Sequence, residues 1–115
     1  MESLPVALAP QREPLARCLE AFNRTRHVRA VYLFGSHARG QARRDSDVDL
    51  CIVADGTESQ SAAARDFRRG IWDVWPRPAL TLVPISPARL AEKKACGDHF
   101  FQTVLEEGVL LATED

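Results

Sequence analysis

The stretch "LFGSHARGQARRDSDVDL", Leu33–Leu50, joins a glycine-bounded turn, several arginines and a group of acidic residues. The acids Asp45, Asp47 and Asp49 are close enough along the chain to repel one another, and folding does not require them. An apolar run that ends at glycine is typical of a buried strand followed by a turn. The stretch therefore predicts two strands that present a polar site between them.

The residues on either side support two strands. "VRAVYLFG", Val28–Gly35, is rich in β-branched and aromatic residues, which favours a largely buried strand. "DVDLCIVA", Asp47–Ala54, predicts a second strand. Because side chains alternate across a strand, Asp47 and Asp49 share one face, while apolar residues share the other.

The rest of the chain predicts helices that alternate with one or two further strands. The expected elements are a helix over Glu13–Arg26, a helix over Ser61–Trp75 that Gly70 weakens and Pro76 ends, a strand over Ala79–Ile85, a helix begun by Ser86 and Pro87, a helix over Asp98–Glu107 and a short strand at Val109–Leu111. This order predicts an α/β (α+β) fold, with a small mixed β-sheet and helices packed on it.

Length and charge limit what such a fold does. The chain has 115 residues, about the size of one domain, so we expect a single domain over residues 1–115. A net charge of −1 gives no global attraction for polyanions, and we expect neither direct nucleic-acid binding nor membrane binding. Any anion must be bound locally.

Cysteines and the N-terminal stretch indicate a cytoplasmic protein. Cys18, Cys51 and Cys96 are far apart and form no C-x-x-C pair, so we expect reduced, buried thiols and neither disulfides nor a cysteine zinc site. "MESLPVALAP" lacks the basic segment and long apolar run of a signal peptide.

Aromatic and histidine side chains receive mainly structural interpretations. Trp72 and Trp75 fall on the predicted helix Ser61–Trp75 and are expected in the core, although exposure of both would indicate a partner interface. His37 is expected on the surface of the turn.

Asp47 and Asp49 are candidate Mg²⁺ ligands, because hard divalent ions are held by one or two carboxylates together with substrate phosphates. The alternative is a solvated strand start, where Asp45 and Ser46 cap a turn. The neighbouring "GSHARG" favours the metal site. Glycine and serine directly after a buried strand let backbone amides and a hydroxyl approach an anion, so Gly35 and Ser36 are candidate phosphate ligands.

The arginines after this turn complete a triphosphate site. Arg39, Arg43 and Arg44 carry guanidinium groups that suit phosphate oxygens.

Two better-known motifs are excluded. A P-loop would need lysine and Ser/Thr after Gly40, where Gln41 and Ala42 stand, and the acidic run lacks the glycine and the glutamate of an EF-hand loop.

The paired motif "FGSHARG" and "DSDVDL" resembles the minimal nucleotidyltransferase (MNT) family of the DNA polymerase β superfamily. The resemblance implies a nucleotidyltransferase fold, with ATP as substrate and Mg²⁺ as cofactor. By position, Gly35 and Ser36 would grip the phosphates, and Asp47 and Asp49 would hold metal and act in catalysis. It also implies a partner: stand-alone members resemble antitoxins that neutralise a HEPN-type toxin, some by transferring AMP to it.

The chain departs from this family in the third predicted strand. Aligning "LTLVPIS" with the family pattern places Thr81 where a third carboxylate usually completes the metal site and helps deprotonate the attacking hydroxyl. Loss of a general base costs about 10² to 10⁴-fold in rate. Asp66 and Asp73 are possible substitutes, but both fall on the predicted helix.

Three functions remain open from the sequence. The first is transfer of AMP from ATP to a partner protein. The second, motivated by Thr81, is a weakened antitoxin or binding module that blocks its partner by contact alone. The third is nucleotide transfer to a small molecule, which would need a pocket that a homodimer could supply.

Overall fold

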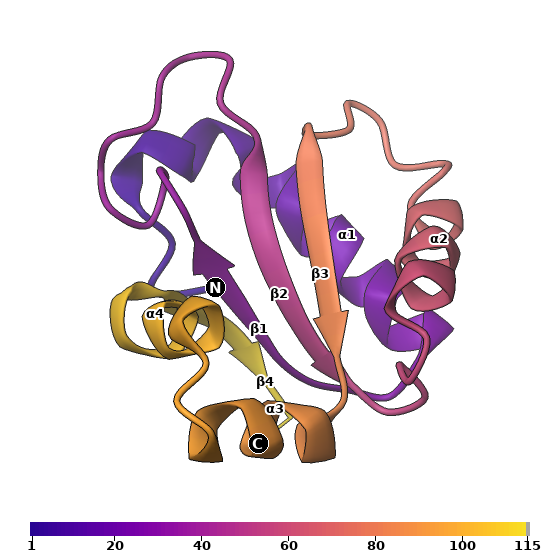
Figure 1. Ribbon diagram of the computed structural model, residues 1–115. Coiled ribbons are helices and arrows are strands. Elements are labelled where there is room, and N and C mark those ends of the chain that lie inside the picture. Colours follow the sequence, from indigo (N-terminus) through magenta and orange to yellow (C-terminus); the bar gives the residue numbers. More distant parts are fainter. Residues whose placement is uncertain (115) are drawn as a thin grey trace.

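The computed structural model describes residues 1–114 (Figure 1). In chain order the elements are the 3₁₀ helix η1 (Val6–Gln11), α1 (Arg12–Thr25), β1 (Val28–Phe34), β2 (Val48–Ala54), α2 (Gln60–Gly70), β3 (Leu80–Ile85), α3 (Pro87–Ala95), α4 (His99–Glu107) and β4 (Val109–Thr113). The strands form one sheet in the order β3-β2-β1-β4. Strand β1 is antiparallel to β2 and β4, whereas β2 and β3 are parallel. This is the mixed sheet with helices that the sequence predicted.

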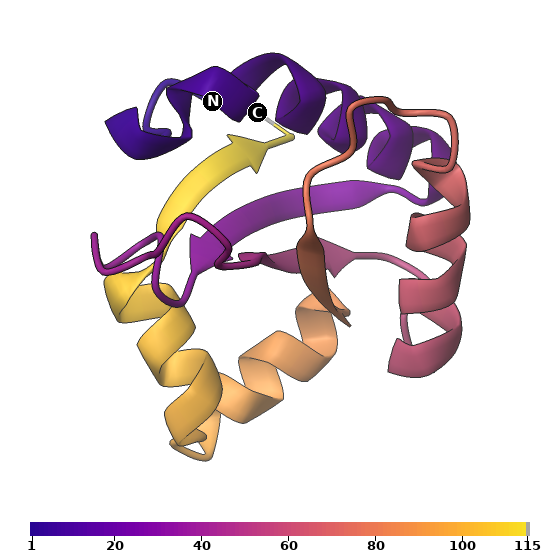
Figure 2. The ribbon, with the colours of Figure 1, turned by 90° about the horizontal axis from the view of Figure 1, so that it is seen from above.

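Helices cover both faces of the sheet (Figure 2). The face that carries Leu50 and Ile52 packs against α1 and α2, and both side chains are fully buried. The opposite face carries Cys51 and Val53, which pack with Phe101 and other side chains of the α3–α4 side. Strand β2 is therefore apolar on both faces beyond its first residues, and the polar face predicted for it is confined to the end that holds Asp49.

An aromatic pair joins α1 and α2 in the larger core. The rings of Phe22 and Phe67 meet edge to face, with centroids 5.2 Å apart and planes at 77°. Such pairs add about 0.5 to 1.5 kcal/mol beyond the burial of their apolar area. The contact fixes α2 beside the sheet, next to β3 (Figure 1).

Side-chain caps start three helices. Ser59, Ser86 and Asp98 precede α2, α3 and α4, and each accepts a hydrogen bond from a backbone amide of the first turn. The start predicted at Ser86 and Pro87 is confirmed, because proline occupies the first helical turn. The sequence predicted the cap at Ser86 but not those at Ser59 and Asp98, although all three are local in sequence.

The predicted helix Ser61–Trp75 is too long. Helix α2 ends at Gly70, where glycine lowers helix propensity by about 1 kcal/mol relative to alanine. A side chain at this position would also lie 2.6 Å from the hydroxyl of Thr25 on α1, so the close packing of the helices requires glycine. The predicted burial of Trp72 and Trp75 is wrong as well, since both side chains are 79% exposed.

The cysteine prediction holds for two residues and fails for one. Cys18 and Cys51 are buried, and burial raises the pKa of Cys51 to about 12. Cys96 is exposed because it follows the last turn of α3, outside the core. No helix within residues 1–114 has the length and apolar character needed to cross a membrane.

Candidate functional site

The two candidate metal ligands lie at the end of the sheet where β2 begins. Asp47 directly precedes β2, and Asp49 is its second residue. In the parallel pairing of β2 and β3, Asp49 lies opposite Thr81. The Thr81 hydroxyl donates a hydrogen bond to Asp47 Oδ2 at 3.2 Å. Thr81 therefore stands beside both carboxylates, where a third acidic side chain would complete the group.

Gly35 brings the turn into direct contact with this group. Asp49 pairs with Phe34 across the antiparallel strands, so the residue after Phe34 passes the carboxylate. A Cβ at Gly35 would lie 2.1 Å from Asp49 Oδ2, and its φ of +76° is a conformation that only glycine adopts readily. The glycine predicted to face phosphate is thus also the residue that makes room for the acid.

Charges around Asp49 set its protonation. Its pKa is raised, first because burial penalises the charged form and also because Asp47 carries a like charge. The Thr81 hydroxyl and the charges of His37 and Arg39 act in the opposite direction. The ionised form of Asp49 is therefore disfavoured in free energy by its surroundings, and a bound cation would offset this effect.

Backbone hydrogen bonds close the Gly35–Gly40 turn. The Arg39 amide donates to the Gly35 carbonyl at 3.2 Å, and the Gln41 amide donates to the Ser36 carbonyl at 2.9 Å. Among the hydrogen bonds of residues 1–114, none is donated by the amide of Ser36 at the start of this turn. Gly35 and Ser36 thus present backbone polar groups beside Asp49.

His37 contributes more than the surface position expected for it. The side chain is half-buried, and Nε2 lies 3.3 Å from the Ser46 carbonyl oxygen, one residue before Asp47. This contact ties the turn to the segment that carries the acids. The only sequence signal for this role was the place of His37 inside the glycine-bounded turn.

The three candidate phosphate-binding arginines, Arg39, Arg43 and Arg44, are all exposed, and Arg39 and Arg43 are placed differently. Arg39 is exposed, and its Nε donates to Gln41 Oε1 at 3.2 Å, while its charge acts on Asp49. Arg43 lies on the exposed loop, where its amide donates to Ser46 Oγ at 2.9 Å. Ser46 therefore caps this loop as the structural alternative predicted. The structure brings Arg39 to the acids but not the side chain of Arg43.

Neither candidate substitute for the third carboxylate reaches the site. Asp66 of α2 forms an ion pair with Arg26, and Asp73 is exposed in the turns after α2. Within residues 1–114, no three His, Cys, Asp or Glu side chains gather where they could hold a metal ion. Asp47, Asp49 and the Thr81 hydroxyl are the oxygen ligands that this end of the sheet offers.

Two hollows flank the carboxylates. One, of about 240 Å³, lies between the turn and α4 and is mainly apolar; its lining residues are Phe34, Gly35, Ala38, Arg39, Phe100, Thr103, Val104 and Glu107. The other, of about 490 Å³, includes Asp47 and lies against β3 and the end of α2; among its lining residues are Arg68, Trp72, Arg77 and Leu80. The acids thus separate an apolar hollow from a basic one.

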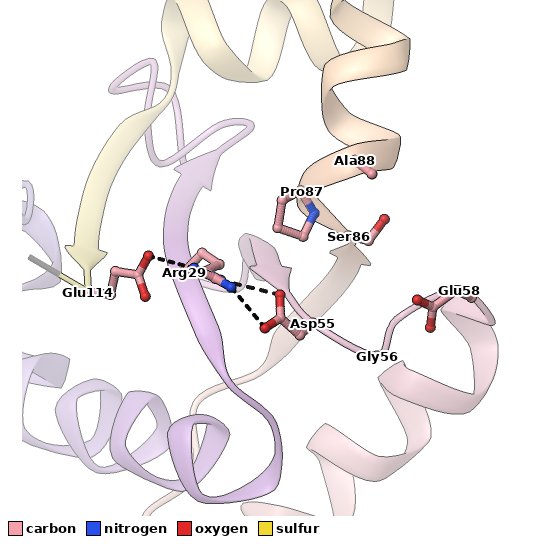
Figure 3. A pocket seen from close by; sticks show the side chains of 8 residues that line it. All are labelled: Arg29, Asp55, Gly56, Glu58, Ser86, Pro87, Ala88 and Glu114. Atoms are coloured by element: carbon pink, nitrogen blue, oxygen red, sulfur yellow. Dashed lines mark hydrogen bonds and ion pairs between the residues drawn. The ribbon is translucent and has the colours of Figure 1, made fainter.

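A larger hollow, of about 670 Å³, lies at the opposite end of the sheet (Figure 3). Arg29 bridges its two sides, because it bonds both oxygens of Asp55 at 3.1 to 3.2 Å and Glu114 Oε1 at 3.0 Å. His27 contacts the same two acids. These charges are satisfied by one another, so the cluster ties the end of β4 to β1 and β2 and does not form a second reactive site.

Comparison with known proteins assigns the chain to a family. The nucleotidyltransferase domain family matches residues 15–108, which include the turn, both acids and Thr81. The chain belongs to the nucleotidyltransferase domain family. The superfamily expected from the paired motif is thereby confirmed. Among curated proteins, none matches the sequence.

Solved structures share the fold of this nucleotidyltransferase domain. A protein of Sulfolobus solfataricus that is provisionally assigned as a nucleotidyltransferase matches with a TM-score of 0.59 and 20% identity, over 98% of this chain and 86% of that one. A toxin–antitoxin structure with AMP-PNP matches with a TM-score of 0.53 and 20% identity, over 85% of this chain and 72% of that one. The predicted nucleotidyltransferase fold is confirmed.

Proposed function

We propose that this nucleotidyltransferase domain binds ATP with Mg²⁺ and transfers AMP to a hydroxyl of a partner protein. The hydroxyl oxygen would bond to the α-phosphorus of ATP, the bond between that phosphorus and the oxygen leading to the β-phosphate would break, pyrophosphate would leave, and the hydroxyl proton would pass to solvent. The observation that carries the proposal is the contact between Gly35 and Asp49, which joins a phosphate-binding turn to a pair of carboxylates. Phosphoryl and nucleotidyl transfer rely on positioning of the reacting groups and on stabilisation of their charge. The Gly35 turn and the Asp47/Asp49 pair, which would provide these, lie at one end of the sheet.

The residues fit Mg²⁺ by their chemistry. Asp47 and Asp49 supply carboxylate oxygens, and the raised pKa of Asp49 records charge repulsion and burial that a cation would relieve. Mg²⁺ held there would neutralise charge on the triphosphate. Gly35 and Ser36 would hold the phosphates through backbone amides and the serine hydroxyl, with Arg39 adding positive charge. Arg43 lies on the neighbouring exposed loop, so it would contribute only if its side chain turned toward the bound triphosphate.

The apolar hollow beside the turn suits the nucleoside end of ATP. It shares Gly35 and Arg39 with the phosphate turn, so a nucleotide bound there would extend directly into it. Phe34 and Phe100 line it and meet edge to face with centroids 5.4 Å apart, which offers apolar contact for a base. Thr103 and Glu107 add polar groups at the same hollow.

Thr81 defines the second candidate function. A hydroxyl in place of a carboxylate supplies no general base, so the acceptor hydroxyl would be deprotonated slowly. This favours a domain that binds nucleotide but neutralises its partner mainly by contact. The likeness to a toxin–antitoxin structure with AMP-PNP supports a partner protein and a nucleotide in either case. We infer a cytoplasmic antitoxin with a HEPN-type toxin as that partner.

The test combines the purified domain with the protein encoded next to it. Incubation with ATP and Mg²⁺ should add the mass of AMP to that protein, and an Asp47→Ala/Asp49→Ala variant should add none. Transfer that persists in the double variant, or no transfer by the wild type, contradicts the enzymatic proposal. Neutralisation of the partner in cells by the double variant, with its fold intact, would select the contact mechanism instead.

A further inference from the structure

The molecule exposes a basic and aromatic surface beside the carboxylates. We call it the α2–β3 surface, and define it by Arg65, Arg68, Arg69, Trp72, Trp75 and Arg77. Two hollows, of about 490 and 530 Å³, lie along it and share Arg68 and Trp72. Large exposed apolar groups of this kind mark interaction sites on soluble proteins.

This surface is held in place by the core beneath it. Ile71 and Val74, which directly precede Trp72 and Trp75, are buried. Arg17 donates to the Trp75 carbonyl at 2.9 Å, and Arg77 donates to the Trp72 carbonyl at 3.2 Å. The backbone that carries the two tryptophans is therefore anchored to the rest of the domain, while both side chains are 79% exposed.

The surface is continuous with the candidate active site. Arg68 donates to the Leu80 carbonyl at 3.1 Å, one residue before Thr81, and the 490 Å³ hollow also includes Asp47. The Gly35 turn lies on the β1 side of the acids, and β3 lies on the other side of β2. Because attacking and leaving oxygens are roughly in line in nucleotidyl transfer, an acceptor must arrive opposite the phosphates. That approach crosses the α2–β3 surface.

We propose that the α2–β3 surface docks the acceptor, and that the acceptor is a protein segment with acidic side chains around its reactive hydroxyl. This proposal rests on the proposed function and names its substrate class. Four arginines give the surface a positive charge, and Arg and Trp are the residue types that dominate binding energy at protein interfaces. The chain as a whole carries a net charge of −1, so a long polyanion such as RNA would meet repulsion outside the surface.

The tryptophans supply a direct test, because Trp72 and Trp75 are the two tryptophans of the chain. Intrinsic fluorescence of the intact protein is titrated with a glutamate-rich peptide that contains one tyrosine, with its glutamine and lysine counterparts, and with a single-stranded RNA of equal charge. The acidic peptide should shift the emission saturably and bind at least about tenfold more tightly than the glutamine peptide.

Matched variants separate the surface from charge in general. Arg65→Ala/Arg69→Ala should weaken binding of the acidic peptide by about tenfold, whereas Arg89→Ala/Lys94→Ala, which removes two cations from α3, should not. Equal binding of the three peptides, tighter binding of RNA, or equal loss in both variants would overturn the proposal. ATP binding is measured separately by calorimetry, so failure of the docking surface is distinguishable from failure of the nucleotide site.

Discussion

Thr81 of β3 lies directly opposite Asp49 of β2, and its hydroxyl donates a hydrogen bond to Asp47 at 3.2 Å. A neutral side chain therefore occupies the position from which a third carboxylate would reach both acids. Relative to the three carboxylates that the family resemblance implies, Thr81 would leave the site without one charge and one base. We therefore expect the side chain at position 81 to limit the rate of AMP transfer.

Thr81→Asp should raise the rate of AMP transfer, because the new carboxylate would sit beside Asp47 and Asp49 and act on the acceptor hydroxyl. We expect a gain of about 10² to 10⁴-fold in initial rate at saturating Mg²⁺. Thr81→Asn is the matched control, since it has a similar size and no charge. An aspartate variant no faster than the asparagine variant would show that the third position does not limit turnover.

Gly35 and Gly40 provide a matched pair within one turn. Both have positive φ, so alanine at either position should cost about 1 kcal/mol in the free energy of unfolding. A Cβ at Gly35 would collide with Asp49, whereas one at Gly40 meets no atom within 4 Å. Gly35→Ala should therefore also lose Mg²⁺-dependent ATP binding, and Gly40→Ala should keep it. Equal ATP affinity in the two variants would argue against the contact.

Asp49→Asn should make the folded protein more stable at pH 7. The pKa of Asp49 is higher in the folded state than in the unfolded state. At pH values above the unfolded pKa, ionisation of this carboxyl therefore favours the unfolded state. The gain should vanish at pH values below the unfolded pKa of about 3.9, where the carboxyl is protonated in both states. Denaturant unfolding from pH 3 to pH 8 measures this. Asp45→Asn, which removes an acid from the exposed loop, is the control for the loss of a negative charge outside the site.

The cluster of Arg29 with Asp55 and Glu114 predicts a change of stability with pH that is opposite in sign to that of Asp49. Arg29 lowers the pKa of Asp55 and of Glu114, so their contribution to stability is present above the unfolded values near 4 and is lost as pH falls through the lower folded values. Arg29→Gln should therefore destabilise the protein at pH 7 and flatten the acid limb of its stability profile. Arg89→Ala removes an exposed helix pair with Glu92 and should leave the acid limb unchanged. Parallel acid limbs in wild type and Arg29→Gln would contradict this account.

The apolar hollow makes a separate prediction about the nucleoside. Thr103→Phe should fill it and weaken ATP binding by tenfold or more, while inorganic tripolyphosphate, which lacks a nucleoside, should bind as before. Gln102→Phe adds the same ring to the exposed side of α4 and should alter neither ligand. Loss of ATP and tripolyphosphate together would place the effect on the phosphate turn.

Local features of the fold were predictable from sequence. The strand before Gly35, the cap at Ser86, the helix that begins near Asp98 and the last strand depend on neighbouring residues, and all are present. Helix α2 was overextended to Trp75 although Gly70, where it ends, was recognised as a weak point; the close contact of Gly70 with Thr25 joins residues distant in sequence and could not be predicted. The exposure of Trp72 and Trp75 follows from that early end.

The candidate site also has features that were predictable from sequence and features that were not. The turn and the Asp47/Asp49 pair were identified from a motif, since each lies within a few residues. The alignment of Thr81 with Asp49 depends on a parallel pairing across distant segments, and the resemblance suggested it where periodicity did not. The contact of His37 with Ser46 was indicated only by the place of His37 inside the glycine-bounded turn. The two hollows beside the acids depend on tertiary packing, which no local pattern predicts.

The central claim is that the Gly35 turn and the Asp47/Asp49 pair form one site for ATP and Mg²⁺. Calorimetric titration of ATP into the wild type and the Asp49→Asn variant, each with Mg²⁺ and with EDTA, tests it most directly. We expect the wild type to bind ATP more tightly with Mg²⁺ than with EDTA, and the variant to lose that difference while staying folded. ATP binding that is the same in all four titrations would contradict the claim.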